Sequence, residues 1–151
     1  MAIERDLRFG WDIWALARLV SSLGHSPVYY YHFTHKPPFP ESSVRAGWGA
    51  SHYAELWYMF DHLDQEDWRW TRSDRKLAHE MSSYWVNFIK FGDPNGPGLP
   101  NWPLFTALNP LQLYLDDIIH SGPVADLKTL RVVDAVYSQV RSSAFGELPK
   151  K

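Results

Sequence analysis

The stretch GWGASHYAEL, residues 47–56, places His52 at the end of a long proline-rich loop and directly before an apolar segment. A catalytic histidine must face a cleft while a rigid neighbour holds it, and a loop that runs into a helix meets both requirements. The residues alone leave an ordinary loop histidine as the alternative. Glu55 has a plain structural explanation, because an acidic side chain in the first turn of a helix is stabilised by the helix dipole.

No nucleophile that could work with His52 is evident in the sequence. A nucleophile elbow, Gly-x-Ser-x-Gly, needs its glycines because the strained turn leaves no room for a Cβ atom. The two nearest strings, residues 49–53 and 24–28, end in Tyr53 and Val28 instead of glycine. The chain has no cysteine, which excludes a thiol nucleophile and a disulfide, and it has no glycine-rich phosphate loop.

The other six histidines form no metal-binding pattern. His32 and His35 are three residues apart in or just after a predicted strand, so they point to opposite faces and we expect structural roles. The remaining four have no helical His-x-x-x-His spacing and are expected at the surface: His25, His62, His79 and His120. We therefore expect neither a metal ion nor a cofactor.

Four helices are predicted around these residues. Apolar periodicity and end signals place them at residues 6–23, 52–60, 72–91 and 127–140. The third has the clearest ends, because Thr71 and Asp74 form a capping-box pattern and Gly92 follows its last turn. Asp126 is the predicted cap of the fourth helix.

Residues 28–33, VYYYHF, and residues 111–115, LQLYL, predict strands. A continuous apolar strand is typical of a parallel sheet that helices cover on both faces. One or two strands cannot complete such a sheet, because a lone strand leaves unpaired backbone groups on both edges. We therefore expect an α/β chain, rich in helix, whose residues 1–151 form part of a single larger domain.

Composition excludes several classes of partner. The net charge is −2 without a basic cluster, and no run of 18 apolar residues occurs, so we expect neither nucleic-acid binding nor a membrane span. Localisation stays open. Eight Trp, eight Tyr and eight Phe are many for 151 residues. Since each ring buries roughly 150–250 Å², the rings either lie at a surface that another polypeptide covers or line a pocket. We expect the first, with self-association where that surface is left uncovered.

Several of these segments together resemble one known family. They are DLRFGW (6–11), SPVYYYHF (26–33), GASHYAELWYMF (49–60) and YWVNFIKFGDPNGPGLPNWP (84–103). In this order they are similar to the C-terminal portion of the type-B carboxylesterases, the α/β-hydrolase family that includes para-nitrobenzyl esterases and cholinesterases. The resemblance covers nearly the whole chain.

The resemblance implies that His52 is the catalytic base of a Ser-acid-His triad that hydrolyses a small-molecule carboxylic ester. It also implies that the serine, the acid and the oxyanion hole belong to a missing N-terminal part, so that the 151 residues alone lack activity. Glu55 matches an acidic family position and is expected to support the turn. Trp48 and Tyr53 lie near the expected pocket. Position 53 is usually small in the family, so Tyr53 either narrows the site or packs outward.

Two other functions remain open at this point. One is a non-catalytic binding or adhesion module, as in some cholinesterase-like proteins. It would differ from an enzyme because the polypeptide outside these residues would have no serine elbow. A stand-alone small helical domain would have to close its sheet without further strands. The histidine in its matching sequence context favours the enzyme.

Overall fold

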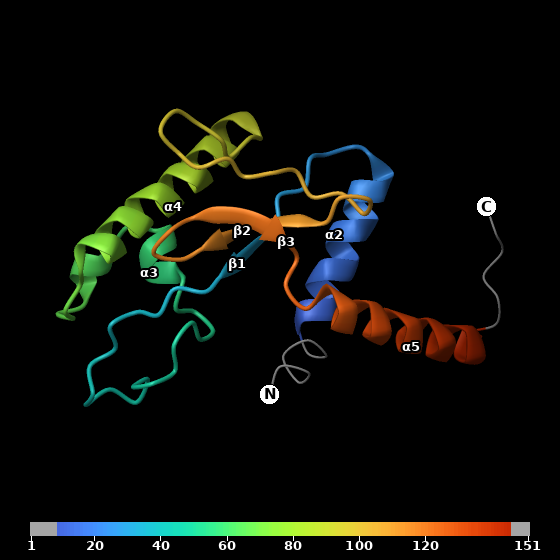
Figure 1. Ribbon diagram of the computed structural model, residues 1–151, viewed down its shortest axis with the longest axis horizontal. Coiled ribbons are helices and arrows are strands. Elements are labelled where there is room, and N and C mark those ends of the chain that lie inside the picture. The colour runs from blue at the N-terminus through green and yellow to red at the C-terminus, as the bar shows by residue number, and fades with distance from the viewer. Residues whose placement is uncertain (1–8, 146–151) are drawn as a thin grey trace. The chain divides into compact units, whose positions relative to one another are not determined.

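The computed structural model describes residues 9–145, with side chains to residue 143 (Figure 1). The chain divides into two compact units. The first contains the described residues up to 28, residues 105–110 and the described residues from 123 onward; the second contains residues 29–104 and 111–122. The candidate residues at positions 48–55 therefore all belong to the second unit.

The second unit contains a small sheet with strand order β1-β2-β3. Its strands are β1 (Tyr31–Phe33), β2 (Leu111–Leu115) and β3 (His120–Pro123), whose last residue belongs to the first unit. β1 and β2 are parallel, with Tyr31 opposite Leu113. A helix-rich chain with a small, incomplete sheet is thus confirmed.

Two details of the strand prediction were wrong. The strand expected at residues 28–33 is shorter, because Tyr29 forms an isolated antiparallel bridge with Leu104 instead. The third strand, HSGP, was not predicted, because it lacks the β-branched and aromatic residues that mark strands. β2 lies between the other two strands, and its residues Leu113 and Leu115 are fully buried.

Helix α4 (Arg72–Phe91) forms the largest part of the core of this unit. Its N-terminus has the predicted capping box: the Asp74 amide donates to Thr71 Oγ1 at 3.2 Å, and the Thr71 amide donates to Asp74 Oδ2 at 2.7 Å. Gly92 ends the helix in left-handed backbone with φ 71°, as predicted. Its buried face packs against the short helix α3 (Leu56–Met59) (Figure 1), through residues that include Leu77, Met81, Tyr84 and Tyr58.

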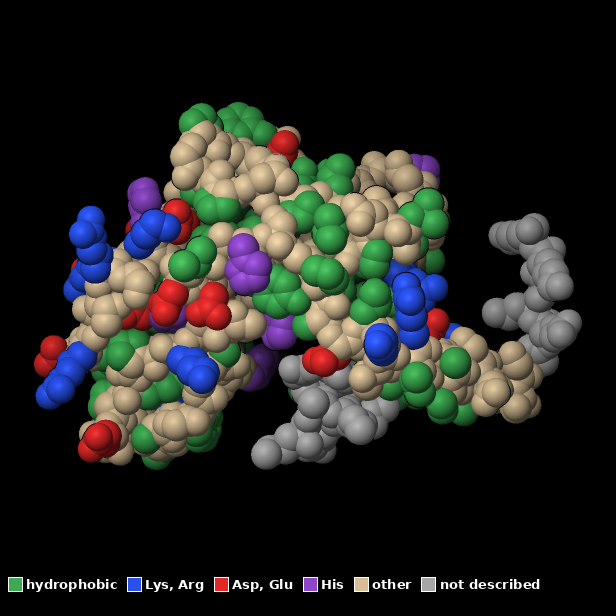
Figure 2. Space-filling model, in the orientation of Figure 1, with side chains coloured by type: hydrophobic (Ala, Val, Ile, Leu, Met, Phe, Trp, Pro, Cys, Tyr) green, Lys and Arg blue, Asp and Glu red, His purple; other side chains and the backbone are tan. Residues whose placement is uncertain are grey.

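Only the first part of α4's apolar stripe is covered. Near its C-terminus the exposed fractions are 46% for Phe88, 80% for Ile89 and 75% for Phe91. Figure 2 shows apolar side chains at the surface around this end of the helix. Such a group is a candidate for association with another polypeptide.

Most described aromatic rings pack against one another. Trp102 lies 5.3 to 6.0 Å, between ring centroids, from the rings of Tyr29, Tyr31, Tyr84 and Trp85. Six aromatic side chains of residues 9–143 are exposed: Phe9, Trp48, Tyr53, Phe60, Phe88 and Phe91. The aromatic excess therefore builds the core of the second unit more than it covers an open surface.

The segment after α4 is held by one amide side chain. Asn95 Oδ1 accepts from the Trp102 amide at 2.7 Å, and Asn95 Nδ2 donates to the Trp102 carbonyl at 3.1 Å. Asp93 Oδ1 accepts from the Asn95 amide at 2.9 Å and Nδ2 at 2.8 Å. These bonds satisfy the backbone N–H and C=O of Trp102 and close the loop that the turn residues of DPNGPGLPNWP predict.

The first unit joins two helices, α2 (Trp11–Leu23) and α5 (Leu127–Phe145). Residues 6–8 of the predicted first helix lie outside the described residues. Asp134 of α5 accepts from Trp11 Nε1 at 3.1 Å and from Arg18 Nη1 at 2.9 Å. Asp126 precedes α5 with φ 52°, outside the extended backbone that a capping side chain normally requires.

None of the described helices is both long enough and apolar enough for a membrane span.

Candidate functional site

His52 lies in a turn that leads into α3. The Ala54 amide donates to the Ser51 carbonyl at 2.9 Å, and the Leu56 amide donates to the Tyr53 carbonyl at 3.2 Å. The predicted helix at residues 52–60 is therefore shorter, because Tyr53 adopts left-handed backbone with φ 70°, which a right-handed helix excludes. The result is a histidine that is exposed and anchored by the helix that follows it.

Tyr53 and Trp48, the two aromatic residues expected near the pocket, are also exposed. The Tyr53 ring centroid is 3.9 Å from that of His52 with the planes at 38°, and 60% of Tyr53 is exposed. Trp48 is 58% exposed, in the same loop. A cavity of about 590 Å³ is lined by the earlier loop residues 38–42 and by residues 67–69, and His52, Tyr53 and Trp48 do not line it.

Glu55 is the residue directly before α3 and is half-buried. Burial raises the pKa of the Tyr31 hydroxyl in β1, and the negative charge of Glu55 raises the pKa further. The Glu55 carboxylate is thus near enough to the Tyr31 hydroxyl for its charge to act there, while the supporting role expected for Glu55 stays a prediction.

Ser51, the neighbour of His52, is not an activated nucleophile. Its Oγ atom is buried and has no hydrogen-bond partner among the described residues. A serine nucleophile requires a hydrogen bond to its base. The turn thus offers an accessible proton acceptor without a nucleophile of its own.

A second, buried group of titratable residues surrounds His35. Its Nε2 lies 2.7 Å from Asp74 Oδ1, and its Nδ1 lies 3.0 Å from Asp117 Oδ1 and 3.8 Å from Asp116 Oδ1. Tyr58 Oη donates to Asp74 Oδ1 at 2.7 Å. Both ring nitrogens of His35 therefore face carboxylate oxygens.

Sequence reasoning gave His35 a structural role and missed its partners. The predicted capping box of Thr71 and Asp74 is confirmed, and the other oxygen of Asp74, Oδ1, bonds His35 and Tyr58. Among the described residues, one group places possible metal-ligand atoms within 4.8 Å of one another: His35, Asp116 and Asp117. The sequence signal for this group is two consecutive acidic residues, Asp116 and Asp117, directly after the predicted strand at residues 111–115. In the structure this strand, β2, is parallel to β1, which His35 follows.

The Asp74 carboxylate is held in its ionised form. Burial by itself raises its pKa, but hydrogen bonds from Thr71, Tyr58 and His35 outweigh burial and keep the pKa below the ordinary value. The charge is therefore a permanent part of the second unit near neutral pH.

Comparison with known proteins identifies the family. The model of the carboxylesterase family matches residues 1–120. Mouse carboxylesterase 5A is 34% identical over 125 residues, which is 76% of this chain and 21% of that protein. Human cocaine esterase is 37% identical over 81 residues, 53% of this chain and 14% of that protein. The chain thus spans about a fifth or less of these relatives.

Solved structures agree with the fold. A thermophilic PNB esterase superposes with a TM-score of 0.66 at 25% identity, over 79% of this chain and 24% of that one. A second PNB esterase gives a TM-score of 0.63 at 26% identity, over 78% of this chain and 23% of that one. The predicted α/β-hydrolase class is therefore confirmed. The chain belongs to the carboxylesterase family.

Proposed function

We propose that this chain supplies the catalytic histidine of a carboxylic ester hydrolase and that His52 is that residue. Family membership and the names of the relatives, cocaine esterase and carboxylesterase 5A, support ester hydrolysis. The observation that carries the choice of residue is the exposure of His52 on a turn anchored by α3. A base of this kind has to reach a proton on a separate group.

In this proposal the nucleophile is a serine from polypeptide outside these 151 residues. His52 accepts the serine hydroxyl proton as the oxygen forms a bond to the ester carbonyl carbon. The same proton then goes to the alcohol oxygen as its bond to the acyl carbon breaks. Water repeats the sequence on the acyl-serine and releases the carboxylic acid, with His52 again carrying the proton.

The remaining predicted residues have positioning roles. Glu55 is the residue directly before α3 and supports the turn from that position. Tyr53 lies against the imidazole ring and limits its rotation, and Trp48 contributes apolar surface from the same loop. An ester with an apolar acyl group suits such surroundings.

A fluorophosphonate probe tests the reaction class, because it forms a covalent bond with an activated serine. The complete gene product that carries these 151 residues is labelled, digested and mapped by mass spectrometry. We expect one labelled serine outside residues 1–151, and no labelling or ester hydrolysis by the 151-residue chain alone. A label on Ser51 or another serine of this chain contradicts the proposal, as does an unlabelled complete protein, which favours a binding module.

A further inference from the structure

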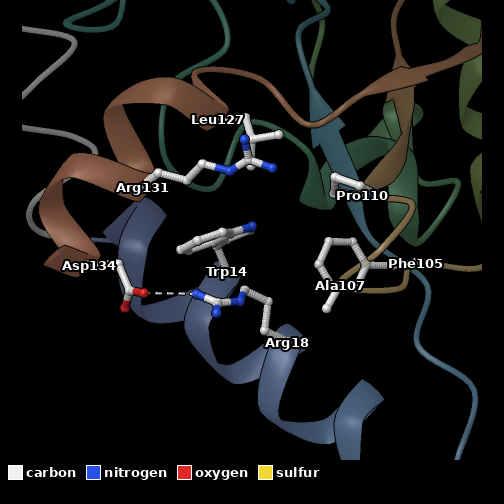
Figure 3. A pocket seen from close by; sticks show the side chains of 8 residues that line it. All are labelled: Trp14, Arg18, Phe105, Ala107, Pro110, Leu127, Arg131 and Asp134. Atoms are coloured by element: carbon white, nitrogen blue, oxygen red, sulfur yellow. Dashed lines mark hydrogen bonds and ion pairs between the residues drawn. The ribbon is translucent and has the colours of Figure 1, made fainter. Parts of the chain in front are cut away.

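The first unit contains a cavity that the proposed ester hydrolysis does not use. Its volume is about 190 Å³, and α2, residues 105–110 and α5 form its walls (Figure 3). The lining residues are Trp14, Arg18, Phe105, Ala107, Pro110, Leu127, Arg131 and Asp134. Helix α5 lies beyond residue 120, where the match to the family ends.

Trp14 presents an unsatisfied donor in this cavity. The residue is only 3% exposed, and its Nε1–H has no hydrogen-bond partner among the described residues. In Figure 3 the indole nitrogen faces the middle of the ring of lining residues. Buried indole N–H groups usually find an acceptor, so this donor points to a ligand that carries one.

The two arginines of the cavity differ in how they are satisfied. Arg18 Nη1 bonds Asp134 Oδ2 at 2.9 Å, and the Arg18 guanidinium carbon lies 4.4 Å from the centre of the Trp14 ring. The other oxygen of Asp134 accepts from Trp11 Nε1. Arg131, by contrast, has no carboxylate partner in the described part of the chain, although its guanidinium lies over the same cavity (Figure 3).

The charges lining the cavity therefore do not balance. Arg18 and Arg131 contribute two positive charges and Asp134 one negative charge, so one positive charge remains. A guanidinium and an indole N–H that face one space suit a carboxylate, whose two oxygens accept two hydrogen bonds.

The rest of the wall is apolar and sets the size of the ligand. Phe105, Ala107, Pro110 and Leu127 supply this apolar part, with Phe105 and Pro110 on the side opposite Asp134 (Figure 3). A cavity of about 150 Å³ in another protein holds benzene, so about 190 Å³ accommodates one ring with a small substituent. A small inorganic anion would leave these apolar side chains without a contact, so the cavity suits an organic ligand better.

We propose that this cavity binds a small organic carboxylate of about the size of benzoate. The carboxylate accepts from the Arg131 guanidinium and the Trp14 indole N–H, and the hydrocarbon part lies against Phe105 and Leu127. The site is independent of His52 and of whether the protein hydrolyses esters.

Calorimetric titration of the 151-residue chain with benzoate tests the site. Two substitutions address the two donors: Arg131→Gln removes the charge of an exposed side chain, and Trp14→Phe removes the N–H while keeping an aromatic ring. Lys128→Gln is the matched control, because Lys128 is an exposed cation on the same helix outside the cavity. Circular dichroism and the melting temperature check that each variant is folded.

We expect saturable, one-site binding of benzoate that R131Q weakens about tenfold or more and W14F severalfold, with K128Q unchanged. Benzamide, which has the same ring without the charge, and inorganic phosphate should bind at least tenfold more weakly. Absence of saturable benzoate binding overturns the proposal. So does equal weakening by R131Q and K128Q, which would indicate non-specific attraction, or binding of phosphate as tightly as benzoate, which would contradict the apolar part of the site.

Discussion

His35 Nε2 lies 2.7 Å from Asp74 Oδ1, and this contact joins the segment after β1 to the first turn of α4. The same carboxylate accepts from Tyr58 of α3 at 2.7 Å and from the Thr71 amide at 2.7 Å. One buried charge thus connects the strand, the short helix that follows His52 and the long helix. The position of the His52 turn depends on this connection through α3.

Replacing Asp74 by Asn should lower stability near neutral pH and reduce its loss in acid. Hydrogen bonds hold the folded-state pKa of Asp74 below its ordinary value of about 3.9. The ionised group therefore stabilises the fold above that value, and the contribution disappears as the pH falls through the folded-state pKa. We expect D74N to lower the free energy of unfolding by about 2–4 kcal/mol near pH 7.

Urea denaturation followed by circular dichroism at pH 7 and near pH 3 measures both effects. Asp64→Asn is the control, because Asp64 pairs with Arg75 at 2.9 Å while its side chain is 84% exposed. Such a surface pair contributes about 1 kcal/mol or less. Equal unfolding midpoints for D74N and the wild-type chain at pH 7 would contradict the assigned role.

Asn95→Ala should destabilise the loop that follows α4. The substitution removes the acceptor for the Trp102 amide and the donor to its carbonyl, and leaves the Trp102 peptide without these partners. We expect a cost of about 2–3 kcal/mol in the free energy of unfolding. Asn101→Ala, at an exposed position of the same loop, should stay within about 0.5 kcal/mol of wild type. A small effect of N95A, equal to that of N101A, would refute the bonding pattern as the basis of this motif.

The exposed apolar end of α4 should promote self-association of the 151-residue chain. Ile89→Lys places a charge in the surface formed by Phe88, Ile89 and Phe91. Val44→Lys adds the same charge at an 84% exposed site elsewhere and is the control. Sedimentation velocity at increasing concentration should show association of wild type and V44K and a shift toward monomer for I89K. Wild-type chain that remains monomeric at high concentration would show that this surface is too small to drive association.

Local signals in the sequence predicted the ends of the long elements well. The capping box at Thr71 and the left-handed Gly92 lie where helix chemistry requires them, because both depend on residues next to each other in the chain. The α/β-hydrolase class followed from motif order. β3 was missed, because HSGP acquires strand structure from pairing with β2 and not from its own propensity.

The site was predictable only in part, for a related reason. The turn around His52 could be recognised locally, while its catalytic role came from the family resemblance and stays a prediction. The partners of His35 could not, since Asp74 and Asp117 are 39 and 82 positions away along the chain and only the fold brings them together. The cavity lined by Arg131 and Trp14 is likewise set by the packing of α2 on α5.

Turnover of a chromogenic short-chain ester by the complete gene product, with His52→Gln compared with His79→Gln, decides whether His52 is the catalytic base. His79 is an exposed histidine on α4 and serves as the matched control. We expect H52Q to lower kcat by about 10⁴-fold to 10⁶-fold with an unchanged melting temperature, while H79Q retains wild-type kcat. A folded H52Q variant that hydrolyses the ester as fast as H79Q would contradict this role.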